Sequence, residues 1–293
     1  MRNAVPLSIP SGQAPERAKP MLIRMNTSMW IGCSIIIILV VAAIFAPLLS
    51  HYPPAKQNLF DQLALPGSAY IFGADQYGRD IWSRMLLGAR YSLLIGLLAV
   101  FSAMIVGTLI GMIAGYRGGK IDIILMQVMD VILAFPSLIL GIALVALMGA
   151  TMTNIIAAIA FTSVPAFARV ARASVITQRD REYVQACNAM GFSASRILFR
   201  HILPAILPEV MVLASLWMAN AVRTEASLAF VGLGLAPPTP TWGGMVRDGF
   251  DNILNSPHLA LFPSLAILLL VLAFNLIGDG LRDLIDPRLK DSH

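Results

Sequence analysis

Few side chains in this 293-residue chain could do chemistry, and they are not grouped into a reactive site. The four histidines are far apart: His51, His201, His258 and His293. Neither HExxH nor GxSxG occurs, so the spacing that would place two zinc ligands or a serine nucleophile on one element is missing. The two cysteines, Cys33 and Cys187, lack CxxC or Cys/His spacing and are expected to be free thiols. The sequence therefore predicts no catalytic centre and no metal site.

The segment that comes nearest to a nucleotide-binding loop is AGYRGGKI, residues 114–121. A P-loop needs glycine at its first position and a serine or threonine hydroxyl for magnesium at its last. Ala114 and Ile121 occupy those two positions. Lys120 is better explained as a positive anchor at a membrane surface. We therefore expect a protein that is not an enzyme, holds no cofactor of its own and draws on an energy source outside this chain.

The elements that must position the charged residues are membrane helices. Hydrophobic residues make up 57% of the chain and charged residues only 13%, against about 25% charged residues in a typical soluble domain. Apolar runs on the order of 20 residues, long enough to cross a bilayer, recur along the sequence. We expect an all-α polytopic membrane protein with six spans: 28–50, 91–115, a run that follows the tight loop 116–120 and ends near Gly149, 154–168, 205–222 and 259–277.

Six spans place both termini on the same side of the membrane. With that side inside, fifteen of the 21 lysines and arginines are cytoplasmic, so the preferred topology is N-in, C-in. Nucleic acid is then not needed to explain the net charge of +5. The expected organisation is a cytoplasmic tail (1–27), the first membrane helix (28–50), an extracytoplasmic loop (51–90), a core with five membrane helices (91–279) and a second cytoplasmic tail (280–293). Within the core, loop 173–204 is cytoplasmic and loop 236–257 is extracytoplasmic.

Three charged residues near the spans are candidates for function, because a charge inside a bilayer is costly. Asp130 has enough apolar sequence after it to lie at the membrane boundary, and a boundary role is favoured over one in a pathway. Glu225 adjoins a glycine-rich segment, and two interpretations stay open: it packs against Arg223, or it lines a gate. Segment 227–242 contains PPTP and two glycines and is expected to leave the regular helix.

Two other patterns predict local structure. Gly107, Gly111 and Gly115 repeat at every fourth position, which lets another helix approach closely. In loop 51–90, charged residues alternate with apolar ones around Trp82, and this alternation predicts an amphipathic helix on the outer membrane surface.

The longest polar interruption in the second half of the chain, residues 182–208, reads as two short helices. The first is expected to end before Gly191, which can adopt a positive φ, and the second to begin at Ser193 or Ser195. Pro204 and Pro208 are expected to end or kink a helix at the entry to the next span. Each short helix has an apolar face, and the sequence leaves open whether that face rests on the membrane or in a groove of a partner protein.

At these residues the chain resembles a known family, the inner-membrane permease subunits of binding-protein-dependent ABC transporters. EYVQACNAMG (182–191) followed by ILFRHILP (197–204) is similar to the family's EAA signature. Cys187 replaces a second alanine, and Gly191 follows Ala186 by five residues. The dipeptide/oligopeptide (peptide/nickel/opine) branch, and its C-type permease, is matched more closely. The segments similar to that branch are FGADQYGRDIWSRMLLGAR (72–90), LAFP (133–136), TEASLAFVGLG (224–234), PPTPTWG (237–243), FNLIGDGLRD (274–283) and DPRL (286–289).

The resemblance implies a type I ABC importer permease in a bacterial or archaeal inner membrane. Loop 173–204 would then be the coupling helix that docks on an ATPase subunit, through six residues: Glu182, Ala186, Gly191, Arg196, Arg200 and Pro204. ATP and magnesium would bind to one or two such partner ATPases. A second homologous permease would complete the pathway, and an extracytoplasmic solute-binding protein would dock on the outer loops. Candidates for that docking are Arg79, Asp80, Arg84 and Trp242.

The resulting hypothesis is a permease subunit that forms half of the pathway for dipeptides, oligopeptides or related small solutes. The alternative is an ATP-independent channel or secondary carrier, which would transport solute without partner subunits. The sequence does not identify the solute, since a separate protein selects it in this family.

Overall fold

The computed structural model describes residues 26–285, and its regular structure over that range is helical. Residues 1–25 of the expected tail 1–27, and the end of the second tail with Arg288 and Lys290, lie outside the described residues. The helices are α1 (Thr27–Ile44), α2 (Ala46–Leu49), α3 (Ile81–Arg117), α4 (Gly119–Leu133), α5 (Ser137–Met148), α6 (Met152–Arg179), α7 (Glu182–Ala189), α8 (Ala194–Ile197), α9 (Leu203–Leu228), α10 (Trp242–Phe250) and α11 (His258–Ile285). A 3-10 turn covers Leu59–Asp61, and π-helical turns cover Leu198–Ile202 and Ala229–Leu233.

Five helical segments are long and apolar enough to cross a membrane, and the bent pair α4–α5 makes up to six. This agrees with the expected six spans. The second span is longer than expected, because α3 begins at Ile81 and runs without interruption for 37 residues. At 1.5 Å per residue it is about 55 Å long, so it extends well beyond an apolar layer of about 30 Å. The expectation of a separate amphipathic helix on the outer surface is therefore wrong, since most of those residues begin α3.

The third span is not the continuous helix that we expected. The axes of α4 and α5 meet at an angle of 86°. The break falls at 134–136, where Pro136 precedes the first residue of α5. Proline disfavours the helical conformation in the residue before it, here Phe135, and this explains the position of the bend.

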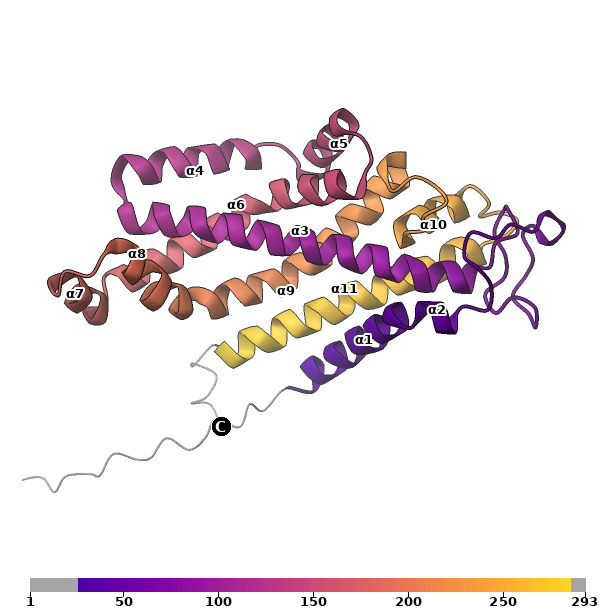
Figure 1. Ribbon diagram of the computed structural model, residues 1–293, viewed down its shortest axis with the longest axis horizontal. Helices are drawn as coiled ribbons and strands as arrows, with labels where there is room; N and C mark the ends of the chain where they lie inside the picture. The colour runs from indigo at the N-terminus through magenta and orange to yellow at the C-terminus, as the bar shows by residue number, and fades with distance from the viewer. Residues whose placement is uncertain (1–25, 286–293) are drawn as a thin grey trace, which may run out of the picture.

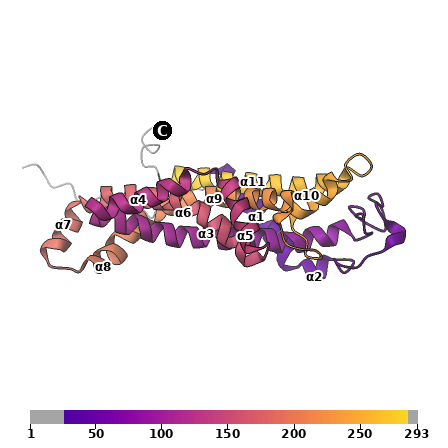
Figure 2. The same ribbon diagram turned by 90° about the horizontal axis from the view of Figure 1, so that it is seen from above.

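The helices form a thin, elongated layer, as the two views show (Figures 1 and 2). Helices α7 and α8, named the coupling segment after the role that the family resemblance implies, lie at one end, and loop 51–80 lies with α10 at the opposite end (Figure 1). Helix α1 begins, and α11 ends, towards the α7–α8 end, as expected for two termini on one side (Figure 1). Segment 227–242 leaves the helix as predicted, at Gly232 with φ of 89°.

The glycine row of α3 packs directly on α6. A Cβ atom at Gly107 would lie 2.6 Å from the Val164 carbonyl oxygen, and one at Gly111 only 2.3 Å from the Ala168 carbonyl oxygen. At Gly115 the nearest atom would be the Arg172 carbonyl oxygen, at 2.8 Å. These distances leave no room for any side chain, so the close helix contact predicted from the GxxxGxxxG spacing is confirmed.

Substitution of Gly111 by alanine should destabilise the protein, because its Cβ would collide with backbone that cannot move independently of α6. Overpacking of this kind costs about 1–3 kcal/mol. The measurement is the midpoint of unfolding in a denaturing detergent titration. Gly141→Ala is the matched control, since its Cβ would meet only Leu228 Cδ2 at 3.9 Å. Equal midpoints for the two variants would contradict the close contact.

Candidate functional site

The backbone of the coupling segment follows the predicted pattern. Helix α7 ends at Ala189, and Gly191 takes a φ of 77°. Ser193 then caps α8, because its hydroxyl accepts a hydrogen bond from the Arg196 backbone N–H. No atom lies within 4 Å of the place where a Cβ would stand on Gly191. Glycine is therefore required at this position by its conformation and not by packing.

The helix after Ser193 does not end at the prolines. Residues Ala194–Leu233 form one apolar helical segment of 40 residues. Pro204 comes two residues after the π-helical turn Leu198–Ile202, and Pro208 lies inside α9. Of the two expected outcomes, an end or a kink, the end is therefore excluded, and α8 is continuous with the fifth span.

One apolar face of the coupling segment is buried within this chain, while Tyr183 and Met190 stay exposed. Val184 and Cys187 of α7 pack with Ile197 of α8 in one cluster. The same cluster contains Ile202 of the π-helical turn and residues from the ends of α3, α6 and α9: Met112, Ala171, Val175 and Ile206. Neither alternative from the sequence, membrane or partner groove, describes this face. Intramolecular packing covers it, so only the opposite face is free to meet a partner.

Two hydrogen bonds tie the segment to its neighbours, and a third joins α6 to α3 beside it. The Tyr116 hydroxyl of α3 lies 3.2 Å from Asn188 Oδ1 of α7. The Arg179 guanidinium of α6 donates to the Gly115 carbonyl oxygen of α3 at 3.1 Å. The Tyr183 hydroxyl lies 3.0 Å from Gln178 Oε1. Together with the apolar cluster, these bonds join α7 to the adjacent ends of α3 and α6.

The six predicted coupling residues are all exposed: Glu182, Ala186, Gly191, Arg196, Arg200 and Pro204. The Arg196 guanidinium lies 4.3 Å from the centre of the Phe192 ring, a distance suited to a cation–π contact. Within residues 26–285, Glu182, Arg196 and Arg200 form no salt bridge. The structure therefore brings these residues together on one end of the molecule with their charges available.

The outer end contains a buried cluster of charges. Asp75 Oδ2 lies 2.7 Å from Arg79 Nε and 3.3 Å from Arg84 Nε. Arg79 also approaches Asp248 of α10 at 3.8 Å. The pKa of Asp248 is raised above its ordinary value because the carboxyl group is partly buried, and the guanidinium groups of Arg84 and Arg79 oppose this effect only in part. Asp80 caps α3 by accepting hydrogen bonds from Ser83, through the backbone N–H at 3.0 Å and the hydroxyl at 2.5 Å.

The four residues predicted to dock a binding protein are 2–4% exposed: Arg79, Asp80, Arg84 and Trp242. Trp242 donates its indole N–H to the Met85 carbonyl oxygen at 3.0 Å. Buried side chains offer no surface to another protein, so this expectation needs correction. In this conformation the four residues hold loop 51–80 and α10 against α3.

Glu225 does not pack against Arg223. Glu225 is buried, and its Oε2 accepts a hydrogen bond of 3.3 Å from the Ser92 hydroxyl of α3. That hydroxyl in turn accepts the Trp242 backbone N–H at 3.2 Å, which links α3, α9 and α10. Arg223 is exposed and bonds to Asn220. Ser92 is 133 residues from Glu225, and no local pattern in the sequence indicated that they meet.

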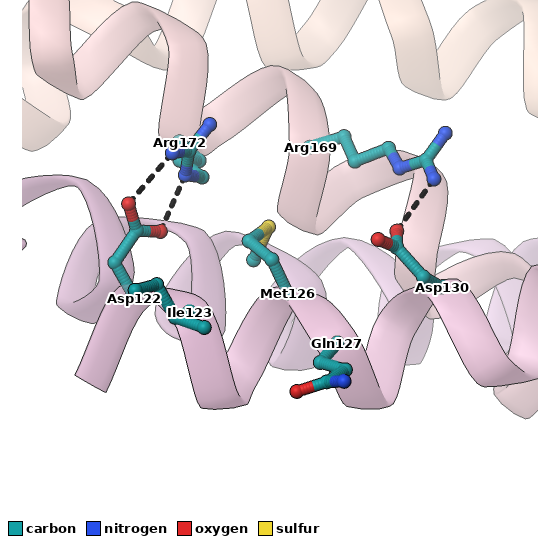
Figure 3. A pocket seen from close by; sticks show the side chains of 7 residues that line it. All are labelled: Asp122, Ile123, Met126, Gln127, Asp130, Arg169 and Arg172. Carbon is teal, nitrogen blue, oxygen red and sulfur yellow. Dashed lines mark hydrogen bonds and ion pairs between the residues drawn. The ribbon is translucent and has the colours of Figure 1, made fainter. Parts of the chain in front are cut away.

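Asp130 faces a groove between α4 and α6, where it pairs with Arg169 at 2.6 Å (Figure 3). Asp122 forms a second pair with Arg172 in the same groove (Figure 3). From the sequence, the two arginines were counted only as cytoplasmic charges. A spacing of three residues places both arginines on one face of their helix. The acids Asp122 and Asp130, in the third apolar run, needed partners of opposite charge. That combination was the signal that could have found the groove.

Comparison with known proteins identifies the class of this fold. Residues 107–291 match the model of the binding-protein-dependent transport system inner membrane component. Residues 23–66 match the N-terminal transmembrane domain of oligopeptide transport permease C. A chain of the MetNI methionine ABC transporter in an inward-facing conformation has the same fold, with a TM-score of 0.57 and 16% identity over 68% of this chain and 95% of that one.

Two relatives are much closer in sequence. The dipeptide transport system permease protein DppC of Alkalihalophilus pseudofirmus is 43% identical over 92% of this chain and 88% of that protein. The glutathione transport system permease protein GsiD of Pectobacterium atrosepticum is 44% identical over 87% of this chain and 85% of that protein. This chain therefore belongs to the family of binding-protein-dependent transport system inner membrane components. It is a multi-pass permease subunit of an ABC importer, and the family resemblance seen in its motifs is confirmed.

Substitution of Gly191 by valine should loosen the coupling segment, because a β-branched residue with positive φ costs about 1–2 kcal/mol. Gly191→Asn is the matched control, since asparagine tolerates this conformation better. Amide hydrogen exchange in residues 182–197 measures the effect, and we expect faster exchange in the valine variant only. Equal exchange in both variants would show that the turn does not depend on its φ angle.

Asp75→Asn should destabilise the outer end, because Arg79 and Arg84 lose the carboxylate that both contact. Breaking a buried pair on one side costs about 3–5 kcal/mol. Thermal unfolding of the purified protein measures this loss. Asp251→Asn, an exposed acid after α10, serves as the control and should leave the midpoint unchanged. An unchanged midpoint in Asp75→Asn would refute the buried cluster.

Proposed function

We propose that this chain forms half of the translocation pathway for dipeptides, oligopeptides or related small solutes, and that separate subunits hydrolyse the ATP. The names of the relatives, a dipeptide and a glutathione permease, support this class of solute. The observation that carries the coupling role is the two-sided coupling segment. Its buried face packs on three membrane helices. Its exposed face and the adjoining turn present the six predicted residues, at the end of the molecule opposite loop 51–80.

The packing explains how a partner's movement would reach the membrane. Val184, Cys187 and Ile197 lie in one cluster with the ends of α3, α6 and α9. A densely packed cluster transmits displacement because its members have no free volume to absorb it. Movement of α7 and α8 by an ATPase subunit therefore moves the three helix ends together. Binding of ATP to the partner would in this way shift the permease between inward- and outward-facing states.

The proposed assembly has four kinds of component. A homologous second permease completes the pathway, one or two cytoplasmic ATPase subunits bind ATP and magnesium, and an extracytoplasmic protein delivers the solute. This chain itself catalyses no reaction and holds no cofactor. The delivery protein would dock on exposed apolar side chains of the outer loops, since the four residues expected from the sequence are buried. Phe60 is fully exposed and Leu254 is 95% exposed.

A coupled transport assay tests the proposal. The chain is purified with its second permease and its ATPases and reconstituted in liposomes with the delivery protein. In the variant Glu182→Ala, Arg196→Ala, Arg200→Ala, dipeptide uptake should fall at least about tenfold, equivalent to about 1.4 kcal/mol. Association with the ATPase should weaken while the spans stay folded. The matched control is Asp251→Ala at the outer end, which should retain normal uptake.

Two results would contradict the proposal. Full uptake by the triple variant would remove the coupling role of α7–α8. Dipeptide uptake by this chain alone, without ATPases, would instead support the channel or secondary carrier.

A further inference from the structure

The groove between α4 and α6 has a volume of about 680 Å³ and is lined by residues of both helices (Figure 3). The volume lies within the range of about 300–1,000 Å³ that is usual for small-molecule sites. Seven residues line it: Asp122, Ile123, Met126, Gln127, Asp130, Arg169 and Arg172. Two acids from α4 and two arginines from α6 thus face one another across the groove.

The two ion pairs differ in the number of hydrogen bonds that they form and in their exposure to solvent. Arg172 binds Asp122 with two hydrogen bonds, of 2.5 and 2.6 Å, and both side chains are largely covered, at 35% and 15% exposed. Arg169 makes one bond of 2.6 Å to Asp130, and these side chains are 54% and 57% exposed. A guanidinium has five N–H donors and a carboxylate has two oxygens. The Arg169–Asp130 pair therefore keeps both donor and acceptor capacity directed at the groove.

Apolar packing does not close this groove. Among the 15 residues of α4 only Met129 is buried. Two glycines with positive φ, Gly118 and Gly119, precede or begin the helix, and the 86° bend follows it. Half-exposed charges on helices this apolar are costly against lipid, so the groove faces water or protein.

Stability alone does not explain the Arg169–Asp130 pair. An exposed ion pair contributes only about 0–1 kcal/mol. The covered, bidentate Arg172–Asp122 pair is better suited to hold α4 on α6. Arg169 and Asp130 can therefore exchange their ion pair for contacts with a ligand with little loss of folding stability.

We propose that this groove binds the zwitterionic main chain of a short peptide on its way through the permease. Arg169 receives the peptide carboxylate on its unused N–H groups, and the unused oxygen of Asp130 receives the ammonium group. The Gln127 amide can pair with the peptide bond. Ile123 and Met126 provide an apolar wall that adapts to different side chains. The inference rests on the proposed function, which supplies the peptide as the solute.

The test is protection of a cysteine placed in the groove of the assembled transporter, without nucleotide, in lipid nanodiscs. Cys33 and Cys187 are first replaced by alanine, and Gln127→Cys is then alkylated with a neutral maleimide. Alanylalanine should slow alkylation about fivefold at four times its dissociation constant, because only empty sites react. N-acetyl-alanylalanine methylamide, which lacks both charges, should not slow it.

Two further variants separate binding from folding. Arg169→Gln should abolish the protection while the free energy of unfolding changes by less than about 1 kcal/mol. Arg117→Gln, an exposed arginine at the end of α3, should keep the protection. The proposal is overturned by equal protection with the neutral analogue, by protection that persists in Arg169→Gln, or by no protection at all. A larger loss of stability in Arg169→Gln would assign the pair to folding and would also overturn it.

The outcome for the groove is distinguishable from that for the proposed function. Dipeptide uptake by the reconstituted transporter without protection at position 127 would remove this binding site and leave the function intact. Protection without any dipeptide uptake would remove the proposed function, and the groove would remain a zwitterion site.

Discussion

The contact between α3 and α6 is the constraint on which the rest of this permease depends. Gly107, Gly111 and Gly115 bring the two backbones so close that no side chain fits between them. Because α3 is 37 residues long, this contact fixes one rod that reaches from the outer charge cluster to the coupling segment. Helix α6 carries Arg169 and Arg172, and only the two-residue turn 180–181 separates it from α7. Both ends of the molecule are thus attached to one rigid pair of helices, α3 and α6.

The charges at the two ends are used in opposite ways. At the outer end Arg79 and Arg84 are buried and share Asp75, and an ion pair of this kind specifies geometry more than it adds stability. At the inner end the charges of the coupling segment are exposed and unpaired with other described residues. The first arrangement fixes the cap over α3, and the second leaves the energy of ion pairing for a partner. The proposed coupling to a separate ATPase would use both properties.

Several features could be predicted because their causes are local. The turn at Gly191 and the Ser193 cap depend on the conformation of one residue and on its nearest neighbours. The apolar runs gave the number of spans, and the glycine spacing gave a close helix contact. The errors share another cause. The alternation around Trp82 was the start of α3, and the third span bends by 86°. For Glu225 one of two open alternatives fails, since it meets Ser92 and not Arg223. Each depends on which distant segments pack together.

The sequence by itself determined the all-α class, the six apolar segments and the family, since these follow from composition and short motifs. Only the tertiary structure decided which face of α7–α8 is free, which arginines are buried and which acids they meet. Helix periodicity shows that a face is apolar but does not show what covers it. In this chain the covering surface comes from α3, α6 and α9, so the choice between membrane, partner and self was made by packing.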